Sequence, residues 1–120
     1  MRIRGVFMEE LTKENRIRKE ERKLKKYFKA LPKNQLEIAT PLIQNAAFMK
    51  VTLEDLQAEI NKNGVSEVYT NGKNQKGIKP SAAASTYNTM FKNYEKVSQR
   101  LQDMLPEEVG KSKLAELMKE

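Results

Sequence analysis

The sequence predicts a mostly α-helical protein: a small domain of about four helices, one short β-hairpin and a mobile C-terminal tail. Apolar residues recur at intervals of three and four over most of the chain, which is the helical period. Pro32, Gly64 and Pro106 close these segments, and one alternating stretch precedes an Asn-Gly dipeptide. With 120 residues we expect a flexible arm (1–11), one domain (12–105, hairpin at 65–80) and a tail (106–120).

The first predicted helix covers residues 12–31, with Thr12 as a suitable N-cap and Pro32 directly after its end. Its first half is almost wholly polar. The apolar residues of its second half are Leu24, Tyr27, Phe28 and Leu31. We therefore expect the second half to pack and the first half to project into solvent.

Two further helices are expected over residues 33–51 and 52–64. Pro41 lies inside the first of them and predicts a kink or a break, because a mid-helix proline removes a hydrogen bond and clashes with the preceding turn. Thr52 with Asp55 resembles a capping box that has Asp in place of Glu, so it predicts a new helix start. Asn63-Gly64 supplies the stop.

The hairpin is predicted from the alternation of residues 65–69, the Asn71-Gly72 turn dipeptide and a possible return strand that ends at Pro80. Three interpretations of its lysines remain open: a basic β-ribbon on DNA phosphates, a surface that packs on a neighbouring copy, and a turn kept soluble by charge. These lysines are Lys73, Lys76 and Lys79.

Ser81 caps the longest predicted helix, which runs to Leu105 before Pro106. Its apolar residues follow a heptad pattern, which favours contact between helices, in the core or between subunits. The residues of this seam are Tyr87, Met90, Phe91, Tyr94, Val97, Leu101 and Met104. The tail carries a weak last helix and is expected to be mobile or to dock a partner.

Several kinds of chemistry are excluded. Cys and His are absent, so the sequence offers no disulfide, no thiolate or imidazole catalysis and no common zinc site, and we expect no metal and no cofactor. Gly72 and Gly77 have the gap of a phosphate-binding loop, but Ile78 follows where that motif needs Lys. The acids have no base or nucleophile beside them, so we expect no enzyme.

The sequence also bears on location. No apolar run approaches the roughly 20 residues of a membrane span, and the apolar stretch near the start is too short for a signal peptide. Met8 is an alternative translation start to Met1. A chain without cysteine suits a reducing cytoplasm.

Positive charge is concentrated at the N-terminus. Residues 1–33 carry twelve Lys/Arg and five Glu, which accounts for the whole net charge of +7, whereas residues 34–120 carry eleven of each sign. Such a patch attracts polyanions, so we expect nucleic acid as a partner, with a solvated surface helix as the alternative. Besides the three hairpin lysines, the candidate DNA contacts are Arg16, Arg18, Lys19, Arg22, Lys23, Lys25, Lys26 and Lys29.

The run "VYTNGKNQKGIKPSAAASTYNTMFKNYEKVSQRLQDMLP" (68–106) resembles small terminase subunits of tailed bacteriophages, especially a family frequent in phages and prophages of Gram-positive bacteria. That family has a basic N-terminal helix, a helical pair, a turn of the type NG-x-N-Q-x-G, then KPS and a YNTM…KNY helix ending in LLP, where this chain has MLP. The matching residues are Asn71, Gly72, Asn74, Gln75, Gly77, Lys79, Pro80, Ser81, Tyr87, Asn88, Thr89, Met90, Lys92, Asn93 and Tyr94.

The resemblance, which covers roughly residues 20–106, implies a non-enzymatic protein of the host bacterial cytoplasm. Such a protein assembles with its own copies into a ring and binds double-stranded viral DNA at the packaging start site. It also recruits and regulates a large subunit that holds the ATPase and nuclease. Two alternatives stay open: a DNA-binding transcriptional regulator whose helix-turn-helix is formed by residues 31–44 and 51–64, and a phage structural or scaffold protein that uses the seam without binding DNA.

Overall fold

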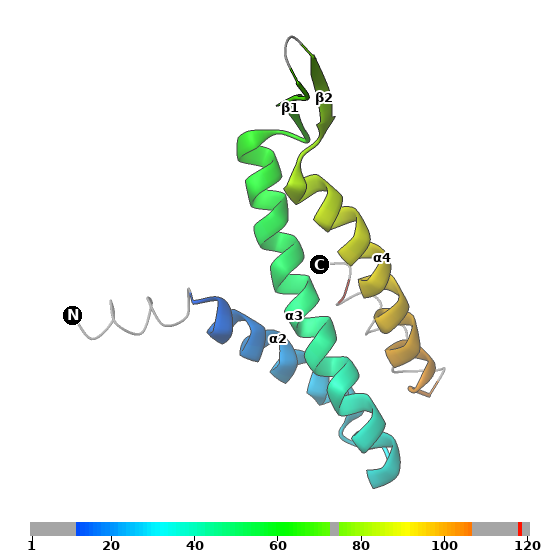
Figure 1. Ribbon diagram of the computed structural model, residues 1–120. Coiled ribbons are helices and arrows are strands. Elements are labelled where there is room, and N and C mark those ends of the chain that lie inside the picture. The colour runs from blue at the N-terminus through cyan, green and yellow to red at the C-terminus, as the bar shows by residue number, and fades with distance from the viewer. Residues whose placement is uncertain (1–11, 73–74, 107–117, 119–120) are drawn as a thin grey trace, which may run out of the picture.

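The computed structural model describes residues 12–72, 75–106 and 118, and these are mostly helical. The elements in chain order are α2 (Lys13–Phe28), α3 (Lys33–Asn63), β1 (Ser66–Thr70), β2 (Lys76–Pro80) and α4 (Ala82–Asp103). α3 and α4 run antiparallel, α2 crosses α3, and the hairpin extends from one end of the long pair (Figure 1). The predicted fold class is confirmed, although the described residues form three long helices where about four were expected.

Two predicted helix starts are confirmed by their caps. Thr12 Oγ1 accepts a hydrogen bond from the backbone N–H of Asn15 at 3.2 Å, and Ser81 Oγ accepts one from Ala84 at 3.0 Å. Each hydroxyl satisfies a donor that the first turn of a helix leaves without a partner. α2 ends at Phe28, somewhat earlier than its predicted end.

The prediction of two separate helices over residues 33–64 was wrong, because they form one continuous helix, α3. α3 does not break at Pro41, which lies on its exposed side. Thr52 lies inside the helix and is no N-cap. The physical reason is packing: Met49, Val51 and Leu53 are all buried, so apolar contacts continue across the expected boundary and outweigh a local start signal.

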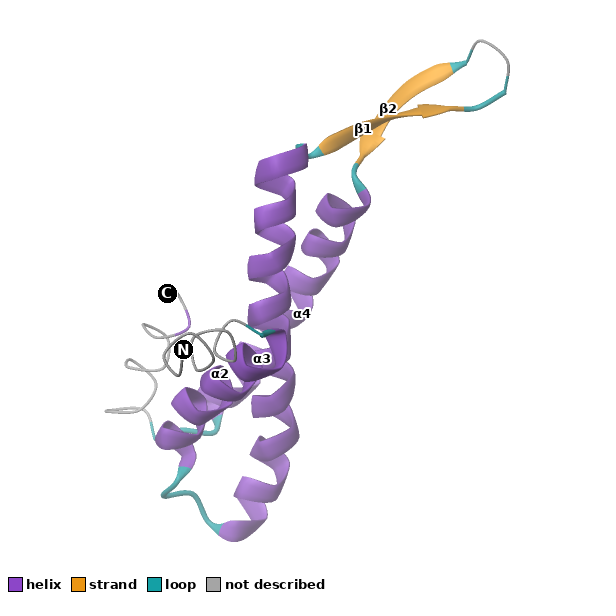
Figure 2. Cartoon of the chain, turned by 90° about the vertical axis from the view of Figure 1, so that its left-hand side faces the viewer, coloured by secondary structure: helices purple, strands orange, loops and turns teal. Residues whose placement is uncertain are grey.

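The hairpin follows the prediction closely. β1 and β2 pair antiparallel over Ser66–Thr70 and Lys76–Pro80. The backbone N–H of Asn71 donates to Gln75 O at 2.8 Å at the turn, and that of Ser81 donates to Val65 O at 2.9 Å at the base. The strands extend beyond the helices (Figure 2).

The two glycines of the hairpin serve different needs. Gly72 has φ 75°, the left-handed region that the turn requires and that glycine adopts without strain. At Gly77 the need is space, since a Cβ there would lie 2.7 Å from the ring of Tyr69. Tyr69 therefore lies directly over the glycine of the partner strand.

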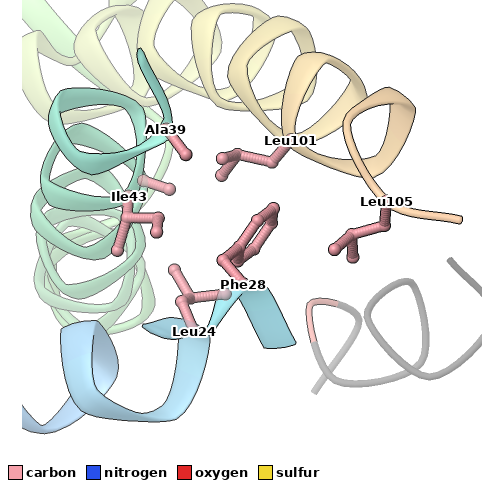
Figure 3. Close-up of a cluster of buried hydrophobic side chains, with 7 residues drawn as sticks. Leu24, Phe28, Ala39, Ile43, Leu101 and Leu105 are labelled. Carbon is pink, nitrogen blue, oxygen red and sulfur yellow. The ribbon is translucent and has the colours of Figure 1, made fainter. Parts of the chain in front are cut away.

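The core lies where α2, the first half of α3 and the end of α4 meet. Phe28, 1% exposed, lies at its centre, and Leu101 is fully buried (Figure 3). The other buried members are Leu24, Ala39, Ile43, Ala46 and Leu105. The second half of α2 therefore packs as predicted.

The predicted arm (1–11) and nearly all of the predicted tail lie outside the described residues. Met118 is described, and it packs against the core. Within the described ranges, no helix is long and apolar enough to cross a membrane.

Replacing Phe28 by Ala tests the core. Phe28→Ala should lower the free energy of unfolding by about 3–5 kcal/mol, because it leaves a cavity among buried side chains. Urea titration measures this. Phe91, which is 42% exposed, provides the matched control, and Phe91→Ala should cost far less. Equal losses would contradict the assignment of the core.

Replacing Pro41 by Ala tests the continuity of α3. Pro41→Ala restores a backbone N–H to the middle of the helix and removes the ring clash, so it should raise the free energy of unfolding by about 1–3 kcal/mol. Pro32→Ala is the control, because Pro32 is the N-cap residue of α3 and precedes the helical ladder. A destabilised Pro41→Ala protein would show that the proline is needed at that position.

Candidate nucleic-acid interface

Four predicted DNA contacts lie together on one side of α2. Lys19, Arg22, Lys26 and Lys29 follow at spacings of three, four and three, which places them on one face of a helix. Lys29 is the C-cap residue and keeps right-handed helical angles, so it continues this face. All four are exposed, and none forms an ion pair with another described residue. We call these four residues the α2 basic face.

The orientation of this face follows from the core. A helix turns by about 100° per residue, so residues three or four apart share a face while the intervening ones point elsewhere. Leu24 and Phe28 are buried against α3 and α4. Arg22 and Lys26, which flank Leu24 at two positions on either side, therefore point away from the core.

Three other candidate DNA contacts form ion pairs with glutamates of α2, which partly neutralises their charge. The pairs are Arg18 Nη2 with Glu14 Oε1 (2.7 Å), Lys23 Nζ with Glu20 Oε1 (3.4 Å) and Lys25 Nζ with Glu21 Oε2 (3.9 Å). Surface pairs of this kind contribute about 0–1 kcal/mol each and open readily. They partly compensate charge without removing it.

Arg16 binds α2 to α3. Its Nη1 donates to Asp55 Oδ1 at 2.6 Å and its Nη2 to Glu54 Oε1 at 3.1 Å. The hydrogen bond to Asp55 raises the pKa of Arg16, burial opposes this rise, and the hydrogen bond to Glu54 adds to it. Its charge is thus already engaged, and the prediction that the first half of α2 projects into solvent was wrong. The local pattern could not show this, because the partners are 38 and 39 residues apart.

A second ion pair holds the middle of α2. Lys50 Nζ on α3 lies 3.3 Å from Glu20 Oε2, and the two side chains are only 14% and 15% exposed. Near the start of α2, Lys13 Nζ lies 5.1 Å from the centre of the Phe48 ring, a cation–π contact. α2 is therefore attached to α3 along its length, and the α2 basic face has a fixed direction.

The hairpin lysines differ from one another. Lys79 lies opposite Glu67 across the strands, with Nζ 3.5 Å from Oε1, and it also lies 5.8 Å from the centre of the Tyr69 ring. Lys76 is exposed and has no ion pair with a described residue. Lys73 lies outside the described residues. The three interpretations of these lysines remain predictions.

The hairpin also carries an exposed apolar pair that the interpretation of its lysines did not predict. Val68 and Ile78 lie directly opposite each other and are 71% and 76% exposed. The alternation of β1 contained this signal, because period-two strands place every second residue on one side. The hairpin thus presents both charge and apolar surface.

The predicted seam on α4 is divided. Leu101 lies in the core, and Tyr94, Val97 and Met104 pack against it. Near the other end, the rings of Tyr87 and Phe91 stack with centres 6.0 Å apart and planes 7° apart. The part of the seam from Tyr94 to Met104 therefore belongs to this chain's own core. Only the part around residues 87–91 is available to another subunit, and the oligomer remains a prediction.

A groove between α3 and α4, with a volume of about 720 Å³, was missed by sequence reasoning. Its apolar lining comes from Phe48 and Met49 on α3 and from Met90 and Val97 on α4. Its polar lining is Asn45, Thr86, Thr89, Asn93, Lys96 and Arg100, without a carboxylate. Only the pairing of two distant helices creates it, so no single stretch of sequence announces it.

No group of His, Cys, Asp or Glu side chains that could hold a metal ion occurs in the part of the chain that the structure describes. No protein-family model matches the chain, and no curated protein or solved structure matches it either.

Tyr94 offers a test of the packing of α4. Burial raises its pKa from 10.0 to about 12. Below pH 10 the phenol is neutral in the folded and the unfolded chain, so its contribution to stability is complete there. That contribution is lost as pH rises from 10 to about 12, because the unfolded chain ionises first. An absorbance titration of tyrosinate should show a step near pH 12 that Tyr94→Phe removes and Tyr87→Phe retains. A step that survives Tyr94→Phe would contradict the burial.

Proposed function

We propose that this protein is a non-catalytic subunit that binds double-stranded DNA through the α2 basic face. The observation that carries the proposal is a set of four exposed cations on one side of a helix that packs against α3, pointing away from the core and without carboxylate partners among the described residues. Lys and Arg side chains neutralise phosphates and release counterions, which drives binding to DNA.

The geometry of this face favours contact with the DNA backbone. Its four residues lie within residues 19–29, and the ten steps from Lys19 to Lys29 cover about 15 Å along a helix axis, so they could contact phosphates over several nucleotides. Four cations in a row without an amide or carboxylate between them suit phosphate oxygens, which position a protein on DNA without reading its sequence. Recognition of a particular site would need further residues.

The resemblance of residues 68–106 to phage small terminase subunits narrows the role. We propose that the chain binds the packaging start site of viral DNA in the host bacterial cytoplasm. In this role it would assemble with its own copies, as a ring, and recruit and regulate the large ATPase-nuclease subunit. In this chain that run contains most of the hairpin and the whole of capped α4. The stacked pair of half-buried Tyr87 and exposed Phe91 supports a contact between subunits.

Neutralising the α2 basic face tests DNA binding. The variant Lys19→Gln, Arg22→Gln, Lys26→Gln, Lys29→Gln should bind a duplex more weakly. The slope of log affinity against log salt should flatten by up to about 3.6, since each lost phosphate contact removes about 0.9. Fluorescence anisotropy at several salt concentrations measures both.

The matched control removes the same charge elsewhere. Its substitutions are Lys62→Gln, Lys92→Gln, Lys96→Gln and Arg100→Gln, all at exposed positions of α3 and α4. If the control loses as much affinity as the α2 variant, binding follows net charge and the α2 basic face is not the interface. If the unaltered protein fails to bind any duplex at low salt, the DNA-binding role is wrong and a structural or scaffold role is favoured.

The terminase role has its own test. A gene for a terminase large subunit or a portal protein should lie beside the gene for this chain, and the purified large subunit should co-purify with the chain. Native mass spectrometry should show a homo-oligomer, with and without DNA. A strict monomer at high concentration, or no binding to the large subunit, would overturn this role while leaving DNA binding by α2 intact.

A further inference from the structure

The chain contains two Asn-Gly dipeptides, Asn63-Gly64 at the end of α3 and Asn71-Gly72 at the turn of the hairpin. Asn followed by Gly is chemically labile, because glycine has no side chain to keep its backbone nitrogen away from the preceding side-chain amide. Both asparagines are exposed. Exposure alone therefore predicts the same reactivity at both sites.

The hydrogen bonding of the glycine nitrogens separates the two sites. The N–H of Gly64 donates to Ile60 O at 2.7 Å and caps α3. Attack by this nitrogen would require breaking that bond and moving Asn63 out of the helix. At the turn, by contrast, it is Asn71 whose N–H donates to Gln75 O, and Gly72 donates no hydrogen bond to a described residue. The nitrogen of Gly72 thus has no comparable protection from any residue that the structure describes.

We propose that Asn71 is a site of spontaneous deamidation and that Asn63 is protected from it by the cap of α3. The backbone nitrogen of Gly72 loses its proton and bonds to the side-chain carbonyl carbon of Asn71. The bond from that carbon to the side-chain nitrogen breaks, and the nitrogen leaves with the proton as ammonia. Water then opens the five-membered succinimide at either carbonyl, which gives aspartate or isoaspartate. No electrons are transferred to or from the protein.

The product changes the hairpin in two ways. Residues 65–80 contain three lysines and one glutamate, Glu67. A carboxylate at position 71 therefore lowers the net charge of this segment from +2 to +1. Isoaspartate also inserts a methylene group into the backbone beside the bond between Asn71 and Gln75, which closes the turn. The reaction thus alters the tip of the hairpin whether or not the hairpin binds DNA.

The test compares both sites within one peptide. The folded full-length protein is incubated at mildly alkaline pH and digested with trypsin, which cleaves after Lys62 and Lys73 and releases residues 63–73 with both dipeptides. Mass spectrometry locates the mass increase that accompanies replacement of NH2 by OH. We expect it at Asn71, at a rate severalfold higher than at Asn63. In urea, where the cap of α3 is lost, the two rates should converge.

Two variants provide matched controls, because Gly64 and Gly72 both have positive φ and neither has an atom within 4 Å of a built Cβ. Gly72→Ala should slow the reaction at Asn71 severalfold, whereas Gly64→Ala should leave it unchanged. Modification of Asn63 as fast as that of Asn71 in the folded protein would overturn the proposal. So would an unreactive Asn71 in the folded protein, whatever happens in urea.

Discussion

Phe28 lies between α3 and α4 with 1% of its surface exposed, and the direction of every other side chain on α2 depends on that contact. Burying Leu24 and Phe28 fixes the rotation of the helix about its axis. Since each residue turns the helix by about 100°, fixing one face fixes the opposite one as well. The direction of the α2 basic face is thus a consequence of the hydrophobic core, and a change in the core would redirect the charge.

Ion pairs then decide which cations of α2 remain available. Arg16 of α2 pairs with two acids of α3, and Glu20 of α2 pairs with Lys50 of α3. The charge of Arg16 therefore stabilises the contact between the helices. The pair of Glu20 with Lys50 is nearly buried, whereas the partners of Arg16 are about half exposed. Salt screens exposed pairs more than buried ones. Rising salt should therefore loosen the start of α2 before its middle, while the apolar contacts of Phe28 persist.

Local sequence signals predicted local features such as caps and turns. They did not predict features that depend on contacts between residues far apart in the chain. Caps and turns depend on neighbours within a few residues, so Thr12, Ser81 and Gly72 could be interpreted from their surroundings. α3 is continuous because it makes apolar contacts with α2 and α4. The sequence around Thr52 does not show those contacts, so it predicted a helix start there. A heptad pattern records that a face is apolar without recording what covers it. For that reason Leu101, a core residue, could not be told from an interface residue.

The hairpin is held together differently from the helices. A two-stranded ribbon is marginally stable alone. No described side chain outside the hairpin forms a layer over this one, and its strand residues are exposed except for Gly77. Its order comes from the strand pairing, the closing bond at each end and the cover of Gly77 by Tyr69. Its exposed apolar pair would gain stability from contact with another molecule, whereas Lys79 already faces Glu67. These contacts make the hairpin a better candidate for a protein contact than for a DNA contact, whereas the DNA surface that we propose lies on α2.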